Sequence, residues 1–424
     1  MANPLTSPAR AGVSIFTTFF MSGFECSTFV WKDVGRRDLI AETRHREHAL
    51  ADYELLASLG IGVAREAVPW PLVSRGAQFD FSLIDPMIQA LEVTGVVPIW
   101  DFCHYGYPDD ADPFSAAFAD RFAEYCFTAA RYVTSRLHSD WGPYFAPMNE
   151  ITYFAQAGGL WGLIAPRGRD RDTFEALRLA LCAAALAGID AIRTELPEAR
   201  MIAMDPVVNI VAPRDRPDLV EQAHRETWDD PFVAWDVLAG LRQPELGGAP
   251  EKLDIVGVNC YSFGQQELRG DGPHASLDPG DERIIPVRDL IEFAAARYER
   301  PIFVSETSGL RDGRDEWLDD IMQESLAALY DGIDLHGVCL YPAVDMPDWN
   351  DGTWLHNGIA DLIPVDGDLL RAPDLAYVGR IREWQERLRQ PHRVDEAVMS
   401  TPADLNDALA AAERLRNEGD VDWH

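Results

Sequence analysis

Positive charge is scarce in this chain, in which 37 lysines and arginines stand against 70 aspartates and glutamates, a formal net charge of −33. A surface with this balance repels nucleic acid and anionic membranes, so neither is expected as a partner. A neutral or cationic small molecule suits the charge better. Because acidic residues are also common as solubilising surface charge, the composition excludes classes of partner more firmly than it selects one.

Cysteine is scarce as well, and the six cysteines lie far apart, without a C-x-x-C pair or the close spacing of structural zinc ligands. We expect reduced core cysteines, no metal and no cofactor. A leader or membrane span is also missing, because residues 1–12 lack a positive region followed by an apolar one, and Ile15–Phe20 is short and rich in threonine. These absences predict a soluble, cytoplasmic protein.

What the chain does contain is an alternation of short apolar runs with longer helical segments. Its 424 residues, 47% of them hydrophobic, are enough to fill one large α/β barrel. Each short run precedes a polar or glycine-rich segment, as is typical of buried parallel strands. The predicted strands are Val13–Phe20, Gly62–Ala67, Val96–Phe102, Tyr144–Met148, Met201–Asp205, Ile255–Asn259, Ile302–Ser305 and Val338–Tyr341.

The segments between these runs carry apolar residues at helical spacing, as at Phe174, Leu177 and Leu181. The predicted helices are Arg46–Leu59, Leu83–Thr94, Phe118–Leu137, Thr173–Leu196, Leu290–Tyr298, Trp317–Tyr330 and Leu375–Arg389. Eight βα units predict a single (β/α)8 TIM barrel over residues 13–390. Residues 391–424 are expected to form a polar linker and an amphipathic tail helix, and Val207–Lys252 a lid or rim with the fifth helix.

Two glutamates end predicted strands that are far apart in the sequence. Segment 144–150 closes on Asn149 and Glu150, and segment 301–307 closes on Glu306 and a threonine. A single glutamate in such a place often caps the following helix instead. In a TIM barrel, however, the strand ends meet at one face, so Glu150 and Glu306 can line one cleft. Two carboxyls about 5–5.5 Å apart can hydrolyse a β-glycosidic bond with retention.

Other polar residues near strand ends are expected to complete this cleft. Arg65 is the candidate cation that keeps Glu306 ionised, while the charge of Glu306 favours a protonated Glu150. Tyr261 is a candidate hydrogen-bond donor to the nucleophile, and Asn149 a candidate contact of the sugar 2-hydroxyl. The candidate substrate-binding residues are Glu25, His104, Asn259, Tyr341, Asp348 and Trp349. A lone histidine or tryptophan among these can equally be structural.

These segments resemble the family 1 glycoside hydrolases, which are retaining β-glycosidases on a (β/α)8 barrel. Segment 144–150 resembles the family's T-F-N-E-P, which implies the acid/base role for Glu150, and segment 303–308 resembles I-T-E-N-G, which implies the nucleophile role for Glu306. The further matches are Val63–Arg65 with the segment that carries the arginine beside the nucleophile, His104–Pro108 with H-W-D-L-P, Gly257–Ser262 with G-I-N-Y-Y-S, and Tyr341–Trp349 with W-S-L-x-D-N-F-E-W.

The chain departs from this family mostly where the family binds the sugar. Glu25 aligns with a glutamine, Asp348 with a glutamate and Tyr341 with a tryptophan, and Ile151 replaces the proline after the acid/base residue. The departures put a standard glucoside or galactoside subsite in question. An extra carboxylate at Glu25 suggests, as a hypothesis, a sugar that bears an amine or presents a different arrangement of hydroxyl donors.

The predicted function is hydrolysis of a β-linked glycoside or oligosaccharide by double displacement through a covalent glycosyl-enzyme, with transglycosylation as a further outcome. The alternative is a non-catalytic sugar-binding or scaffold protein on the same barrel, against which the retained Glu150, Glu306, Arg65 and Tyr261 argue. A metal-dependent barrel hydrolase is a third option, which the lack of H-x-H or tight His/Asp spacing disfavours. The sugar, the aglycone and the oligomeric state, a homo-oligomer included, are left open.

Overall fold

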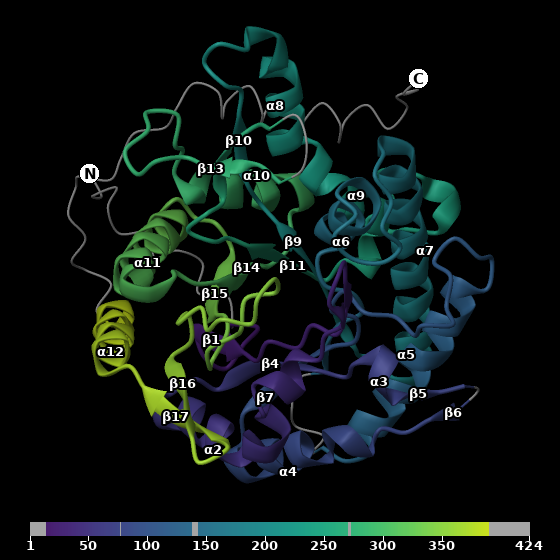
Figure 1. Cartoon of the computed structure of the whole chain (residues 1–424), viewed down its shortest axis with the longest axis vertical. Coiled ribbons are helices and arrows are strands. Elements are labelled where there is room, and N and C mark those ends of the chain that lie inside the picture. The colour runs from purple at the N-terminus through teal and green to yellow at the C-terminus, as the bar shows by residue number, and fades with distance from the viewer. Residues whose placement is uncertain (1–13, 77, 138–142, 270–272, 390–424) are drawn as a thin grey trace, which may run out of the picture.

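Eight parallel strands form a closed barrel in the order β1-β15-β14-β11-β9-β8-β7-β4, so that every strand is paired on both edges (Figure 1). The computed structural model describes residues 14–76, 78–137, 143–269 and 273–389. The barrel strands are β1 (Phe20–Gly23), β4 (Val63–Ala67), β7 (Val97–Asp101), β8 (Tyr144–Ala146), β9 (Arg200–Pro206), β11 (Ile255–Asn259), β14 (Ile302–Thr307) and β15 (Leu335–Leu340). This architecture confirms the predicted TIM-barrel fold.

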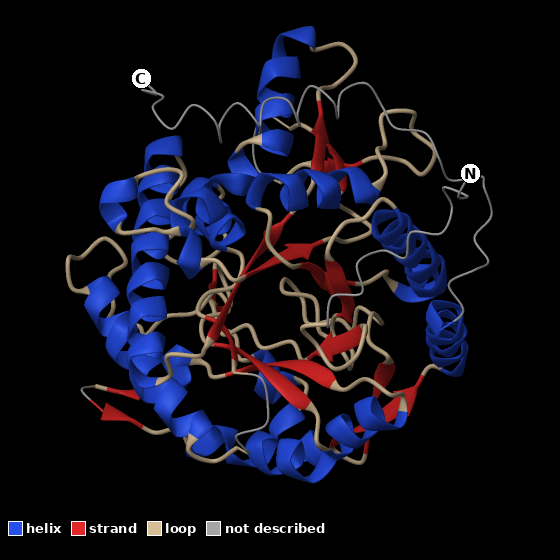
Figure 2. Ribbon diagram, turned by 180° about the vertical axis from the view of Figure 1, so that it is seen from behind, coloured by secondary structure: helices blue, strands red, loops and turns tan. Residues whose placement is uncertain are grey.

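Helices surround the barrel on the outside (Figure 2) and bury their apolar faces against the strands. They are α1 (Leu39–Glu42), α2 (His45–Ser58), α3 (Trp70–Val73), α4 (Asp85–Thr94), α5 (Phe118–Thr134), α6 (Ile151–Ala155), α7 (Arg171–Glu195), α8 (Val220–Trp228), α9 (Val233–Leu238), α10 (Val287–Tyr298), α11 (Arg314–Tyr330) and α12 (Leu375–Arg389). The single-turn elements are η1 (Ser82–Ile84), the π-helical η2 (Gln156–Leu160), η3 (Pro217–Leu219), η4 (Asp230–Phe232), η5 (Pro244–Leu246), η6 (Pro250–Lys252) and η7 (Arg311–Gly313).

The first barrel strand lies later in the chain than the sequence pattern predicted. The prediction of Val13–Phe20 was wrong, because β1 begins at Phe20 and pairs with Val338–Leu340 and Ala64–Arg65. The preceding apolar residues fill the barrel interior instead: the ring of Phe16 lies 5.1 Å from the rings of both Tyr144 and Phe303. A run of this kind satisfies the same hydrophobic pattern whether it is a strand or a core plug.

Four small sheets lie outside the barrel. They are the three-stranded sheet of β10 (Asn209–Val211), β12 (Gln265–Glu267) and β13 (Ala275–Ser276), and the pairs β16 (Ala360–Val365) with β17 (Asp368–Pro373), β2 (Val30–Trp31) with β3 (Gly35–Arg36), and β5 (Ser74–Arg75) with β6 (Gln78–Phe79). We call β10, β12 and β13 the outer sheet. The outer sheet and α8 stand beside the barrel (Figure 1). β10 and α8 belong to Val207–Lys252, and β12 and β13 belong to the segment that follows.

Two further expectations concern the tail of the chain and a membrane span. The predicted tail helix, and the linker at 391–424 that includes it, lie outside the described residues. In the described part of the chain, no helix combines the length and the apolarity needed to cross a membrane.

A buried charge network fixes α2 against β4 of the barrel. The His45 imidazole contacts Asp52 through Nδ1 at 2.7 Å and Glu66 through Nε2 at 2.9 Å, and all three side chains are fully buried. The Tyr53 hydroxyl donates to Glu66 at 2.8 Å, and Arg371 of β17 donates to Asp52 at 2.7 Å. Burial opposes the charged imidazolium, but the two carboxylates outweigh it and raise the pKa of His45 to about 9.

This network predicts that stability falls in alkaline solution. A pKa raised from 6.5 to about 9 in the folded state gives stability that is complete below pH 6.5 and lost as the pH rises through about 9. The contribution is on the order of 3 kcal/mol. The free energy of unfolding of His45→Gln, measured with urea at pH 6, should therefore be much lower than that of wild type. The difference between the two free energies should become smaller above pH 9. His48→Gln, on the same helix but paired with Asp368 at the surface, is the control. A gap that is constant with pH would contradict the prediction.

Candidate active site

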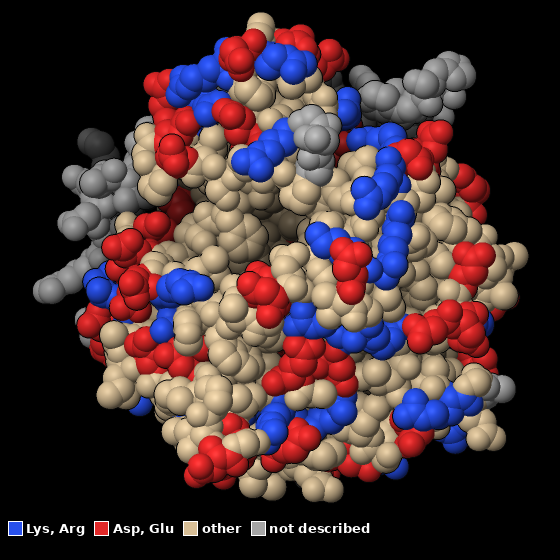
Figure 3. Space-filling model, viewed as in Figure 1, with Lys and Arg blue, Asp and Glu red and all other residues tan. Residues whose placement is uncertain are grey.

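A cavity of about 590 Å³ opens at the C-terminal ends of the barrel strands. Figure 3 shows a hollow near the middle of this face of the molecule. The predicted site residues that line the cavity are Glu25, His104, Glu150, Asn259, Tyr261, Glu306, Asp348 and Trp349. The remaining three, Arg65, Asn149 and Tyr341, lie behind its wall and are almost fully buried. The strand ends thus bring together all eleven residues that the sequence indicated.

Glu150 follows β8 in a tight turn that contacts with two residues of β9 hold in place. Its own N–H donates to the Met204 carbonyl at 2.9 Å, and its φ of +44° puts it in the left-handed region. Asp205, at the end of β9, accepts the Thr152 N–H at 3.0 Å and the Thr152 hydroxyl at 3.1 Å, and so caps α6. Since left-handed backbone is costly for a residue other than glycine, this turn is maintained by its surroundings.

The carboxyl group of Glu150 is buried and faces donors on both oxygens. Oε1 accepts from Asn259 Nδ2 at 2.7 Å, and Oε2 accepts from the Tyr105 hydroxyl. Burial and then the charge of Glu306 raise the pKa of Glu150 to about 7, although the two donors and His104 act in the opposite direction. Glu150 is therefore able to exchange a proton near neutral pH.

Glu306 is the last but one residue of β14 and is held by two donors. Arg65 Nη1 donates to Oε1 at 2.5 Å, and the Tyr261 hydroxyl donates to Oε2 at 2.6 Å. A charge-assisted bond from a guanidinium favours the ionised carboxylate, as does a second donor on the other oxygen. Glu306 thus forms an ion pair with Arg65, whereas Glu150 has no cationic donor.

Arg65 connects Glu306 to the rest of the site. Its Nη2 donates to Asp101 Oδ2 at 2.7 Å and to Asn149 Oδ1 at 3.0 Å, and its Nη1 also reaches the Ser305 carbonyl at 3.1 Å. Asp101 was not among the predicted residues. Asn149, predicted to contact the sugar 2-hydroxyl, does not line the cavity, and both ends of its amide are used inside the protein.

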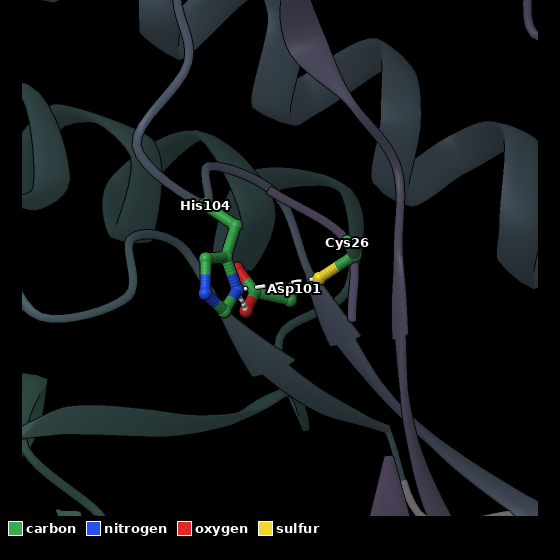
Figure 4. A group of neighbouring side chains, drawn as sticks. All are labelled: Cys26, Asp101 and His104. Atoms are coloured by element: carbon green, nitrogen blue, oxygen red, sulfur yellow. Dashed lines mark hydrogen bonds and ion pairs between the residues drawn. The ribbon is translucent and has the colours of Figure 1, made fainter. Parts of the chain in front are cut away.

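Cys26, Asp101 and His104 form a tight cluster (Figure 4), of which His104 lines the cavity, with ligand atoms within 4.8 Å of one another. These side chains are of types that bind zinc. Two contacts favour hydrogen bonding instead. Arg65 already donates to Asp101 Oδ2, and the Asn149 NH2 group faces His104 Nε2 at 3.1 Å, so Nδ1 is the ring nitrogen that donates to Asp101, at 3.0 Å. The atoms that would bind a metal are therefore already used in hydrogen bonds with one another and with Arg65.

Glu25, Asp348 and Trp349 provide polar groups to the inner wall of the cavity. Glu25 Oε1 accepts the Ser27 N–H at 3.1 Å and also its hydroxyl, and burial raises the pKa of this carboxyl. Neither Glu25 nor Asp348 forms an ion pair within the described residues. The Trp349 indole N–H and the Ser308 hydroxyl are buried without a hydrogen-bond partner. Unsatisfied buried polar atoms beside a cavity are the groups that a polar ligand can satisfy.

Tyr341 occupies a different place from the one predicted for a substrate-binding residue. Its hydroxyl donates to the Phe24 carbonyl at 2.9 Å, and its ring lies under the Arg65 guanidinium, 4.9 Å from the ring centroid. The ring also stacks on His104 at an interplanar angle of 10°. Tyr341 therefore supports Arg65 and His104 from behind.

The outer wall of the cavity comes from the outer sheet and the loops around it. Ile210 of β10 and Gln266 of β12 line it, together with a Glu226–His274 pair at 2.8 Å. The Trp161 ring lies 6.4 Å from the His274 ring, edge to face. For Ile210, Gln266, Glu226 and His274, the sequence indicated nothing beyond the general expectation of a rim over Val207–Lys252. This wall combines an apolar and an aromatic side chain with one ion pair.

Comparison with known proteins agrees with this geometry. No family model matches the chain. Among curated proteins, the chain is similar to the aryl-phospho-beta-D-glucosidase BglC of Bacillus subtilis, with 24% identity covering 73% of this chain and 79% of that protein.

Solved structures show the same fold. The family 1 β-glucosidase of Thermotoga maritima superimposes with a TM-score of 0.68 at 16% identity, covering 90% of this chain and all of that one. The complex of the Thermotoga maritima β-glucosidase with glucoimidazole gives a TM-score of 0.70 at 15% identity, over 88% of this chain and 98% of that one. These findings confirm the resemblance that the sequence motifs indicated.

Proposed function

We propose that this chain, a glycoside hydrolase related to the family 1 β-glucosidases, cleaves a β-linked glycoside with retention of configuration. The observation that supports this best is the unequal environment of two carboxyls on one cavity. Glu306 forms an ion pair with Arg65 and accepts from the Tyr261 hydroxyl, whereas Glu150 has no cationic donor and a pKa of about 7. One nucleophile and one proton donor are what the double displacement needs.

In the first step, protonated Glu150 gives its proton to the glycosidic oxygen while a Glu306 oxygen attacks the anomeric carbon. The bond to the leaving group breaks and an ester bond to Glu306 forms. In the second step, ionised Glu150 takes a proton from water, whose oxygen attacks the anomeric carbon and releases Glu306. An acceptor hydroxyl in place of this water gives transglycosylation.

The other residues then have supporting roles. Arg65 and Tyr261 keep Glu306 ionised and oriented, and Asn149 orients donors around Glu150 rather than contacting the sugar. Glu25, His104, Asn259, Asp348 and Trp349 remain the candidate sugar contacts, because they line the cavity. Tyr341 supports them from behind. No step in this sequence requires a cofactor.

The charges on the cavity favour a sugar without phosphate, in contrast to the substrate in the name of the Bacillus subtilis relative. Glu25, Glu150, Glu306 and Asp348 all line the cavity, and Lys32, exposed at the rim, is the sole lysine or arginine among its described lining residues. A phosphorylated glycone should therefore be hydrolysed at least about tenfold more slowly, in kcat/KM, than its unphosphorylated counterpart. Asp348→Asn removes one of these negative charges, so it should reduce the difference in kcat/KM between the two substrates. A phosphorylated substrate that is hydrolysed faster would contradict this assignment.

The proposal is tested on a panel of nitrophenyl β-glycosides that includes amino, deoxy and pentose sugars, with the α-anomers as controls. Hydrolysis of a β-glycoside, with the β-anomer of the sugar appearing first in proton NMR, is the expected result. First appearance of the α-anomer would exclude retention. Sugar binding without turnover on the whole panel would favour the non-catalytic alternative.

The proposal also includes a cytoplasmic location, which one observation supports. All six cysteines are free and buried. Free cysteines are typical of proteins in reducing compartments. Size-exclusion chromatography with light scattering would determine whether the chain forms a homo-oligomer.

A further inference from the structure

The hydroxyl of Tyr105 is placed against the carboxyl group of Glu150. Tyr105 directly follows His104 in the loop after β7, lines the cavity, and is 5% exposed. Its hydroxyl donates to Glu150 Oε2. The sequence motif that drew attention to His104 continues through this position, where the family pattern H-W-D-L-P has a tryptophan, but it did not single out Tyr105.

The direction of this hydrogen bond is fixed by Arg65, through Asn149. A guanidinium has only donors, so the Asn149 atom 3.0 Å from Arg65 Nη2 is the amide oxygen. The Asn149 NH2 group must then face the Tyr105 hydroxyl oxygen, at 3.3 Å, and donate to it. With its oxygen accepting from Asn149, the hydroxyl of Tyr105 has its own proton available for Glu150. Burial and the charge of Glu150 hold the pKa of Tyr105 well above its usual value, so the phenol keeps that proton.

Backbone strain occurs on both sides of the contact. Tyr105 has a φ of +63° and Glu150 a φ of +44°, so both residues adopt the left-handed region. Left-handed backbone is unfavourable for a residue other than glycine and persists only where its surroundings hold it. Strained residues that meet in a hydrogen bond at a cavity point to a geometry kept for function rather than for packing.

From this geometry we propose that Tyr105 is a positioning residue for Glu150, which it holds in the orientation that serves both proton transfers. The inference rests on the proposed function. As an acid, Glu150 needs its proton directed at the glycosidic oxygen, and as a base it needs a fixed carboxylate facing the water. Tyr105 binds Oε2 in both states, and Asn259 binds Oε1. Arg65 thereby orients donors toward both carboxylates, directly at Glu306 and through Asn149 and Tyr105 at Glu150.

The effect on pH dependence follows from the charged groups around Glu150. The titratable groups that face it are Glu306, His104, Asp205, Tyr105, Tyr153 and Tyr261. Of these, Tyr105 is the one that donates a hydrogen bond to the Glu150 carboxyl. A donor stabilises the ionised form, so its loss raises the pKa of Glu150 further. The alkaline limb of kcat/KM, which reports this group in the free enzyme, should move to higher pH.

The test compares Tyr105→Phe with wild type on one good substrate from the panel. We expect the alkaline limb to move up by about one pH unit. At the acid plateau, the ratio of the rate on an alkyl glycoside to that on a dinitrophenyl glycoside should fall about tenfold, because only the alkyl leaving group needs a directed proton. In a Glu150→Gln background, the same change should leave the dinitrophenyl rate unaltered.

Tyr107→Phe is the matched control, since Tyr107 lies on the same loop, packs against Phe118 and Phe154, and does not line the cavity. The alkaline limb of kcat/KM for Tyr107→Phe should coincide with that of wild type. Because Tyr105→Phe removes a buried hydrogen bond and can impair folding, a second variant keeps the hydroxyl: 3-fluorotyrosine at position 105, a stronger donor, should move the limb to lower pH.

Three results would overturn the inference. An alkaline limb that is unmoved in both position-105 variants shows that Tyr105 does not act on Glu150. Equal shifts in Tyr107→Phe indicate a general effect of the loop. Absence of turnover by wild type on every glycoside rejects the proposed function and this inference with it, whereas turnover with unmoved limbs rejects the role of Tyr105 alone.

Discussion

Glu306→Gly is expected to lose hydrolysis of nitrophenyl β-glycosides by about 10⁴-fold or more, since removal of the nucleophile abolishes the covalent route. Added azide should restore release of nitrophenol and give a glycosyl azide of inverted, α configuration. The small anion takes the space of the missing side chain and attacks from the face that Glu306 occupied. Glu150 continues to protonate the leaving group. The measurement is nitrophenol release with azide, followed by NMR of the product.

The control for this variant is Glu306→Gln, which fills the site and should be inactive with and without azide. Both variants should keep the fold, because Arg65 retains its contacts with Asp101 and Asn149 in either case. Circular dichroism of both variants checks this. Full hydrolysis by Glu306→Gly without azide would exclude Glu306 as the nucleophile.

Glu150→Ala is expected to separate substrates by their leaving groups. The kcat/KM for alkyl glycosides should fall by about 10²–10⁴-fold, the usual contribution of a general acid, while that for dinitrophenyl glycosides should fall far less. The alkaline limb that we expect for wild type near pH 7 should disappear, because the group whose pKa is about 7 is gone. The sign follows from the first step: it needs the protonated acid, so activity falls as the pH rises through that value.

Azide distinguishes the two glutamates by the anomer that it produces. In Glu150→Ala the glycosyl-enzyme on Glu306 still forms, and azide attacks it without needing a base. The product should be the β-azide, of retained configuration, where Glu306→Gly gives the α-azide. The same anomer from both variants would show that the roles of Glu150 and Glu306 are not those proposed.

The sequence predicted the barrel and the two glutamates because strand ends in a parallel barrel meet at one face, whatever the details of the loops. It placed the first strand wrongly, because hydrophobic pattern does not distinguish a strand from a plug such as Phe16. The position of Asp101 could also have been predicted from the sequence, from the alternation of side chains along its strand. Val97, Ile99 and Asp101 alternate along β7, and the first two face the barrel interior, so Asp101 does as well and meets Arg65 there.

Tyr105 and Asn149 show where prediction from the sequence ends. A left-handed φ at Tyr105 turns its side chain into the cavity, and only glycine signals such a conformation from the sequence. Asn149 stands next to Glu150 and so was expected to contact the sugar. The structure engages its amide with Arg65, His104 and Tyr105 instead. Which side of an amide is free depends on neighbours that are far away in the sequence.

The outer sheet makes one wall of the cavity separable from the two carboxyl groups of the proposed mechanism. β10 and β12 come from two different segments and pair in parallel, from Asn209 with Gln265 to Val211 with Glu267, outside the closed ring of barrel strands. Neither segment contributes the paired carboxylates. Loops here can therefore be exchanged, by evolution or by a protein engineer, to admit a new aglycone while the proton-transfer apparatus stays unchanged.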